Sequence, residues 1–187
     1  MDSIAGAGIP VLVLPDAESW GDLVGTVDLV GRALDREEQA SSLIARLEER
    51  KSALARASRP RLRVLPYSNF GAGGRTSGEG TTLDLVIQLA GLQNAAAEAD
   101  IPRHGTVDLE QVLAIDPDLF LTATGRDGVD PGASFLRGEN VLAGLEAVAR
   151  DRILVLPAEL FSTSSHHVLD AAEELARQVD ALLARDR

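Results

Sequence analysis

The apolar positions in the first third of the chain change from a strand pattern to a helical pattern. Residues 9–14 are a β-branched and apolar run bounded by prolines, which predicts a buried strand. From Trp20 to Ala57 the apolar residues recur at helical spacing, which predicts helix in one or two pieces, with Asp35 as the cap of the second piece. Helices in compact domains average about 11 residues. The length of this segment therefore indicates a connecting element.

After Pro60, short apolar runs alternate with helical patterns. Strands are predicted at 62–67, 118–122 and 152–156. Helices are predicted at 81–92, capped by Thr81 or Thr82, at 109–115, with Asp108 and Gln111 as a capping box, at 140–149, and from Ser164 or Ser165 onward. This alternation predicts an α/β fold, a three-layer αβα lobe with a mainly parallel sheet. Ligands of such sheets bind beyond the carboxyl ends of the strands, so the candidate loops are 67–80, 122–134 and 157–164.

Composition narrows the possible functions. The 187 residues include 18 Lys and Arg against 29 Asp and Glu, a net charge of −11, which argues against nucleic-acid binding driven by net charge. Hydrophobic residues make up 45% and charged residues 25%, as in chains with a packed core. No apolar run approaches the roughly 18 residues of a membrane span. The chain has no cysteine, which excludes disulfides, thiolate nucleophiles and Cys-ligated metal.

Local motifs give little support for an enzyme. The glycine-rich loop 71–80 lies between a strand and a helix, but its glycines are not placed against the helix start as in a dinucleotide site, and no P-loop lysine follows them. A flexible loop at the edge of a cleft is the simpler interpretation. His166 and His167 are adjacent, about 100° apart on a helix, and His104 is distant in sequence, so no metal site is predicted. No Gly-x-Ser-x-Gly elbow is present.

Several sequence blocks occur in an order and spacing typical of one family. They are residues 7–14, 63–65, 76–84, 89–94, 107–118 and 145–157. Together they resemble the substrate-binding proteins of ABC importers for cobalamin, haem and ferric siderophores. The resemblance implies a non-catalytic, periplasmic or extracytoplasmic binder without a resident cofactor. Its cargo would be a metal chelate, held between two α/β lobes that a rigid helix joins, and its partner an ABC permease.

The resemblance also implies a domain organisation. Relatives carry an N-terminal lobe before the Gly-Ile-Pro strand, where this chain begins, and no signal sequence is present in the chain as given. Residues 1–19 are therefore interpreted as a remnant strand of that lobe, 20–58 as the connecting helix and 59–187 as the C-terminal α/β lobe. Strand 9–14 would then lack its sheet, and is expected to be displaced, poorly ordered or paired with a second chain. A homodimer through this strand or through the long helix is a further expectation.

The resemblance and the strand-end loops together suggest site residues. Glu110 matches the carboxylate that docks onto a permease arginine. The candidate ligand-binding residues are Tyr67, Asn69, Phe70, Arg75, His104, Arg126 and Phe161. Arginines suit anionic ligands because they donate paired hydrogen bonds. Two other functions stay open: a cytoplasmic α/β nucleotide-binding domain or enzyme that uses loop 71–80, and a regulatory module that dimerises through its long helix.

Overall fold

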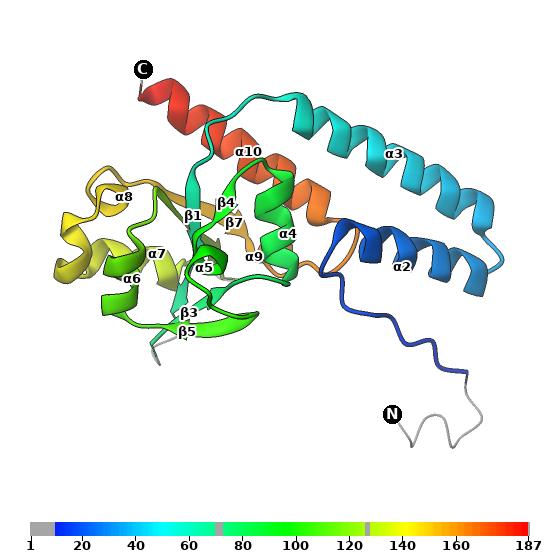
Figure 1. Cartoon of the computed structure of the whole chain (residues 1–187), viewed down its shortest axis with the longest axis horizontal. Helices are drawn as coiled ribbons and strands as arrows, with labels where there is room; N and C mark the ends of the chain where they lie inside the picture. Colours follow the sequence, from blue (N-terminus) through cyan, green and yellow to red (C-terminus); the bar gives the residue numbers. More distant parts are fainter. Residues whose placement is uncertain (1–9, 70–72, 126–127, 187) are drawn as a thin grey trace.

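A four-stranded parallel sheet forms the centre of the structure, a computed structural model that describes residues 10–69, 73–125 and 128–186 (Figure 1). The strand order is β4-β1-β6-β7, with β1 at Arg63–Pro66, β4 at Gln93–Asn94, β6 at Leu119–Thr124 and β7 at Ile153–Pro157. Val64 aligns with Leu119 between β1 and β6, and Phe120 aligns with Ile153 between β6 and β7. The three strands predicted from the apolar runs are confirmed, and the sheet is parallel as expected.

A second, antiparallel sheet of three short strands lies where the sequence predicted a flexible loop. It consists of β2 at Ser68–Asn69, β3 at Gly74–Ser77 and β5 at His104–Val107, in the order β2-β3-β5. A Cβ atom on Gly74 would lie 2.5 Å from the Val107 carbonyl oxygen and 2.7 Å from Cε2 of Tyr67. The glycine that made this segment look like a loop thus allows β3 and β5 to approach each other.

Three helices cover one face of the parallel sheet: α3 at Glu37–Arg56, α4 at Thr82–Leu89 and α10 at Val168–Arg185. Figure 1 shows α3 and α10 running side by side. Alternate strand residues such as Val64 and Leu121 point to this face and pack in one core cluster with Val86 and Leu175. Ser164 and Ser165 do not start α10, because the helix begins at Val168 with His167 as its N-cap residue.

Short helices cover the other face: α5 at Ala95–Glu98, α6 at Leu109–Ile115, α7 at Pro131–Gly138, the 3-10 helix η1 at Asn140–Gly144 and α8 at Glu146–Ala149. Leu65, Phe120 and Ile153 point to this face and form a second core cluster with residues of these helices. The Asp108 capping box of α6 is confirmed. The single helix predicted at 140–149 is wrong, because Leu145 is extended (φ −70°, ψ 133°) and separates η1 from α8.

The long helical segment is a hairpin of two helices, α2 at Trp20–Ala33 and α3. A Cβ atom on Gly31 would lie 2.4 Å from Cβ of Ala40, so glycine lets the two helices approach closely at the turn. Asp35 does not cap α3 as predicted. It has a left-handed backbone (φ 51°), and the N-cap residue is Arg36, whose side chain makes no capping hydrogen bond.

The first described residues, 10–15, run away from the α/β unit before the chain reaches α2 (Figure 1). Residues 10–14, the described part of predicted strand 9–14, form no strand, and Val11, Leu12, Val13 and Leu14 are each 45–59% exposed. The prediction of a buried strand is therefore wrong for these residues, which find no sheet to pair with. Their displacement agrees with the expectation that followed from the family resemblance.

Candidate ligand-binding cleft

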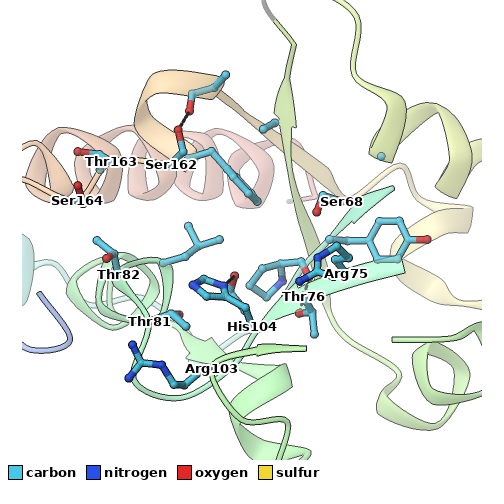
Figure 2. Close-up of a pocket in the computed structure, with 18 of the residues that line it drawn as sticks. Ser68, Arg75, Thr76, Thr81, Thr82, Arg103, His104, Ser162, Thr163 and Ser164 are labelled. Atoms are coloured by element: carbon cyan, nitrogen blue, oxygen red, sulfur yellow. Dashed lines mark hydrogen bonds between the residues drawn. The ribbon is translucent and has the colours of Figure 1, made fainter. Parts of the chain in front are cut away.

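A cleft of about 740 Å³ lies beyond the carboxyl ends of β1, β6 and β7. Its walls come from the antiparallel sheet, from the start of α4, from the loop before α7 and from α9 at Ala158–Phe161. Figure 2 shows side chains from these segments converging on the cleft. The volume falls within the roughly 300–1,000 Å³ of small-molecule sites. The prediction that this edge of the sheet carries the site is consistent with the position of the cleft.

A buried polar network holds the start of α4 against the cleft. Thr81 caps the helix by accepting a hydrogen bond from the Asp84 amide (3.1 Å), and the Asn94 side-chain amide donates to Asp84 Oδ1 (3.1 Å) and to the Ser77 carbonyl (2.9 Å). Thr81, Asp84 and Asn94 are all buried. Buried polar groups that are fully hydrogen-bonded specify one arrangement. The network therefore connects β3, α4 and β4 rigidly, and the sequence predicted only its Thr81 cap.

Gly78 brings the end of β3 against the segment before β5. A Cβ atom at this position would lie 1.7 Å from the Ile101 carbonyl oxygen, so no other residue fits without a backbone shift. The Gly78 amide donates to the Arg103 carbonyl (2.6 Å), and the Arg103 amide donates to the Glu79 carbonyl (3.2 Å). Arg103 itself has a left-handed backbone (φ 38°). These contacts fix the position from which Arg103 and His104 enter the cleft.

Arg75 and His104 share the solvent-exposed face of the antiparallel sheet. Ser77 aligns with His104 and Arg75 with Thr106, so Arg75 and His104 are diagonal neighbours on one face. The Ser77 hydroxyl lies 3.2 Å from His104 Nδ1, and Nε2 of His104 has no partner among the described residues. Arg75 likewise makes no ion pair within the described part of the chain. Both side chains are available to a ligand.

Arg103, which sequence reasoning missed, is paired with acids of the N-terminal segment. One guanidinium nitrogen donates to Glu18, and the other lies 3.5 Å from Asp16 Oδ2. The hydrogen bond and the charge of Glu18 raise the pKa of Arg103. Its partners lie more than 80 positions earlier in the chain, and no local pattern in the sequence could have indicated the pair.

Tyr67 lines the cleft, but its ring lies in the core. The residue is 2% exposed, and its ring contacts Phe120 edge-on (6.3 Å between centroids) and stacks on Phe135 (6.1 Å). Burial raises the pKa of the Tyr67 hydroxyl, and the hydrogen bond from the Asn69 amide (3.3 Å) opposes that rise. The expected ligand contact by the Tyr67 ring is therefore not supported, since the residue follows Leu65 by two positions and points to the same core face.

The remaining predicted residues have different positions. Phe161 and buried Asn69 line the cleft, whereas Phe70 and Arg126 lie outside the described residues. Hydroxyl groups missed by sequence reasoning surround the site: Ser68, Thr76, Thr82, Ser162, Thr163 and Ser164 (Figure 2). Glu110 is exposed in the first turn of α6, outside the residues that line the cleft, and has no partner within the described ranges.

The geometry does not favour a metal or nucleotide site. No group of three or more His, Asp or Glu residues in the described part of the chain is arranged to hold a metal ion. The nucleotide alternative predicted strand 9–14 within the sheet and a phosphate-binding loop at 71–80. The structure instead leaves 10–14 outside the sheet and makes 74–77 a strand. Among the described residues, no helix is both long enough and apolar enough to cross a bilayer.

A three-layer αβα unit with a cleft beyond the carboxyl ends of its parallel strands is the architecture in which α/β domains bind their ligands. The chain belongs to the periplasmic binding protein family, whose sequence profile matches residues 3–160.

Individual relatives agree with this assignment. The chain is 23% identical over 184 residues to an uncharacterised ABC transporter substrate-binding lipoprotein of Bacillus subtilis, YvrC, and the match covers 92% of this chain and 54% of that protein. The periplasmic haem-binding protein RhuT from Roseiflexus sp. RS-1 superimposes with a TM-score of 0.81 at 27% identity, over 94% of this chain and 68% of that one. An ABC-type Fe³⁺-hydroxamate transport protein from Saccharomonospora viridis gives 0.80 at 25% identity, over 95% and 64%. The chain thus spans about half the length of its curated relative.

Proposed function

We propose that this protein is a non-catalytic solute-binding component of an ABC importer, which captures a metal chelate and delivers it to a membrane permease. The observation that carries the proposal is a cleft in which the Arg75 guanidinium and Nε2 of His104, both without a partner among the described residues, face a wall of hydroxyl groups. The family assignment and relatives named for haem and Fe³⁺-hydroxamate transport support a haem, ferric siderophore or cobalamin cargo. The lipoprotein relative supports an extracytoplasmic location.

The cleft suits a ligand that is partly polar and partly apolar. Arg75 offers paired donors to a carboxylate or another oxyanion of the chelate. His104 Nε2 serves as a hydrogen-bond partner or as an axial ligand to iron. Phe161 provides apolar surface on the opposite wall, where Ser162 and Thr163 add hydroxyl groups. No step of bond making or breaking within the cargo is required, so the function is capture and release.

A second lobe would complete the binding site. Val11 to Leu14 expose consecutive apolar side chains in an extended segment, and the relatives are longer than this chain. We propose that this segment packs into a further lobe that closes over the cleft. The alternative is a homodimer through 9–14 or the long helix, which sedimentation of the 187-residue chain tests. A concentration-dependent dimer that Val13→Lys abolishes would support the homodimer through this segment, whereas a monomer at high concentration would argue against either homodimer.

Glu110 is proposed to dock onto an arginine of the permease. It is exposed near the helix N-terminus of α6, where the helix dipole favours a negative charge, and a carboxylate there can accept a bidentate arginine pair. Glu110→Gln should weaken stimulation of the permease ATPase in proteoliposomes and leave ligand binding unchanged. Glu49→Gln, which removes another exposed and unpaired glutamate, is the matched control. Equal ATPase stimulation by both variants would contradict the docking role.

The binding proposal is tested by titrating the chain with haemin, cobalamin, ferric citrate and a neutral ferric trihydroxamate, with ATP and NAD as controls. Absorbance and thermal shift are the readouts. We expect one chelate class to bind, and Arg75→Gln to weaken its affinity about tenfold or more if the group it pairs with is charged. Arg46→Gln, an exposed arginine of α3 without an ion pair in the described residues, is the control. Stabilisation by a nucleotide alone would overturn the proposal.

A further inference from the structure

The N-terminal segment 16–18 forms one edge of the cleft and supplies two of its carboxylates. Asp16, Ala17 and Glu18 all line the cleft. Ala17 is 5% exposed, and its carbonyl accepts a hydrogen bond from the Thr82 hydroxyl (3.4 Å). Glu18 and Asp16 both approach the guanidinium of Arg103. The segment is thus held to the start of α4 on one side and to Arg103 on the other.

We infer that Asp16 and Glu18 are specificity-determining residues: they act as internal anions for Arg103 and restrict the cleft to chelates with little negative charge at this end. The inference rests on the proposed function. It assigns different roles to the two described arginines of the cleft. Arg75 remains available to one anionic group of the cargo, whereas Arg103 is occupied by the protein itself.

The backbone supports this division. Arg103 has a left-handed conformation that its two amide and carbonyl hydrogen bonds to Gly78 and Glu79 maintain. Arg75 is on β3, in register with Thr106 of β5. Figure 2 shows the two arginines on either side of His104. The backbone of Arg103 is thus held in place. Its guanidinium is already paired with Glu18 and Asp16, so these two carboxylates determine the net charge that a ligand meets beside His104.

The charge balance of the cleft points the same way. The described residues that line the cleft carry three carboxylates, on Asp16, Glu18 and Asp130, and two guanidiniums, on Arg75 and Arg103. Asp130 is itself engaged, since it accepts a hydrogen bond from the Thr122 hydroxyl and caps α7. At this end two carboxylates share the single guanidinium of Arg103, which leaves a net negative charge that repels a polyanionic ligand. Amides in place of Asp16 and Glu18 would leave Arg103 free to pair with such a ligand.

The first test compares a polyanionic and a neutral probe. We expect Asp16→Asn/Glu18→Gln to bind ferric citrate about two- to fivefold more tightly than the unchanged chain, as for one exposed charge pair, and a neutral ferric trihydroxamate within about twofold. Addition of Arg103→Gln should remove the gain. Glu38→Gln/Glu49→Gln, which changes the net charge equally on exposed α3, is the matched control. An equal gain in affinity for ferric citrate in the control variant would overturn the inference. So would the absence of any gain for ferric citrate in Asp16→Asn/Glu18→Gln, provided that at least one of the two probes binds the unchanged chain.

The second test needs no ligand. Phenylglyoxal modifies unpaired guanidiniums, and peptide mass spectrometry reports its rate at each arginine. We expect Arg103 to react several-fold more slowly than Arg75 in the unchanged chain, and at a similar rate in Asp16→Asn/Glu18→Gln. Equal rates in the unchanged chain would overturn the internal pairing. If no chelate binds any variant, the proposed function fails together with the specificity role, whereas the labelling rates still decide whether the ion pairs form in solution.

Discussion

Gly78→Ala should destabilise the protein by moving the segment that carries Arg103 and His104. The new Cβ atom would lie 1.7 Å from the Ile101 carbonyl oxygen, against at least 3.4 Å for ordinary contact, and 2.8 Å from the Ile101 carbonyl carbon. Both obstacles are backbone atoms, so rotation of a side chain cannot relieve the overlap. Overpacking of this kind typically raises the free energy of the folded state by about 1–3 kcal/mol.

The displacement also threatens two backbone hydrogen bonds, from Gly78 to Arg103 (2.6 Å) and from Arg103 to Glu79 (3.2 Å). Each contributes about 1 kcal/mol. We therefore expect the free energy of unfolding to fall by about 2–5 kcal/mol, measured by urea titration followed by circular dichroism. Gly25→Ala is the control, because no atom lies within 4 Å of its added Cβ atom on exposed α2, and it should be neutral or stabilising by up to about 1 kcal/mol. A loss below about 0.5 kcal/mol for Gly78→Ala would refute the steric argument.

Three further predictions concern the core and the α3–α10 contact. Phe120→Ala removes a fully buried ring and should lower the free energy of unfolding by about 3–5 kcal/mol in urea titration. Arg50→Gln removes the partner of Asp170, whose pKa is lowered because hydrogen bonds from His167 and Arg50 outweigh the effect of burial. The stability lost in this variant should be largest above the ordinary carboxyl pKa of about 3.9 and should shrink as pH falls, in thermal unfolding from pH 2.5 to 7. Burial lowers the pKa of His166 in the folded protein, so the unfolded chain binds a proton at this residue at higher pH than the folded protein does. Stability therefore rises with pH up to the ordinary histidine pKa of about 6.5. His166→Gln should flatten this pH dependence of the melting temperature below about pH 6.5.

Each of these has an outcome that contradicts it. A Phe120→Ala variant as stable as Phe120→Leu would show that the ring is not tightly packed. For Arg50→Gln, a stability difference that stays constant down to pH 2.5, or one matched by Arg46→Gln, would argue against the pairing with Asp170. An unchanged slope in His166→Gln would mean that other groups cause the pH dependence.

The predictable parts of the fold are those that local sequence determines. Thr81 and Asp108 marked the starts of α4 and α6 because a side-chain oxygen before an apolar stripe satisfies free amides of the first turn. The parallel strands β1, β6 and β7 were visible as apolar runs because both faces of the sheet are covered, whereas the short polar strand β4 was not predicted. The buried position of Tyr67 can also be read from the sequence, because it follows Leu65 by two positions and so points to the same side of the sheet.

The parts that could not be predicted depend on contacts between distant residues. β3 pairs with β5 across an interval that contains α4 and β4, and glycine at position 74 conceals the strand. Arg103 acquires its partners only when segment 16–18 packs against α4. Arg75 was predicted from a strand-end loop and His104 from the family resemblance, but their shared face follows from the β3–β5 register. The site was therefore predictable as a location and not as a set of interactions.

The strand order β4-β1-β6-β7 has a consequence for the kinetics of folding. The central strand β1, at Arg63–Pro66, pairs with β4 at Gln93–Asn94 and with β6 at Leu119–Thr124, so its partners follow it by roughly 30 and 55 positions. Loop closure must precede these pairings, and domains dominated by distant contacts fold slowly. During synthesis, the apolar residues of β1 have no strand partner until β4 and then β6 have emerged. The parallel sheet can therefore be completed only after β7 at Ile153–Pro157 has been synthesised.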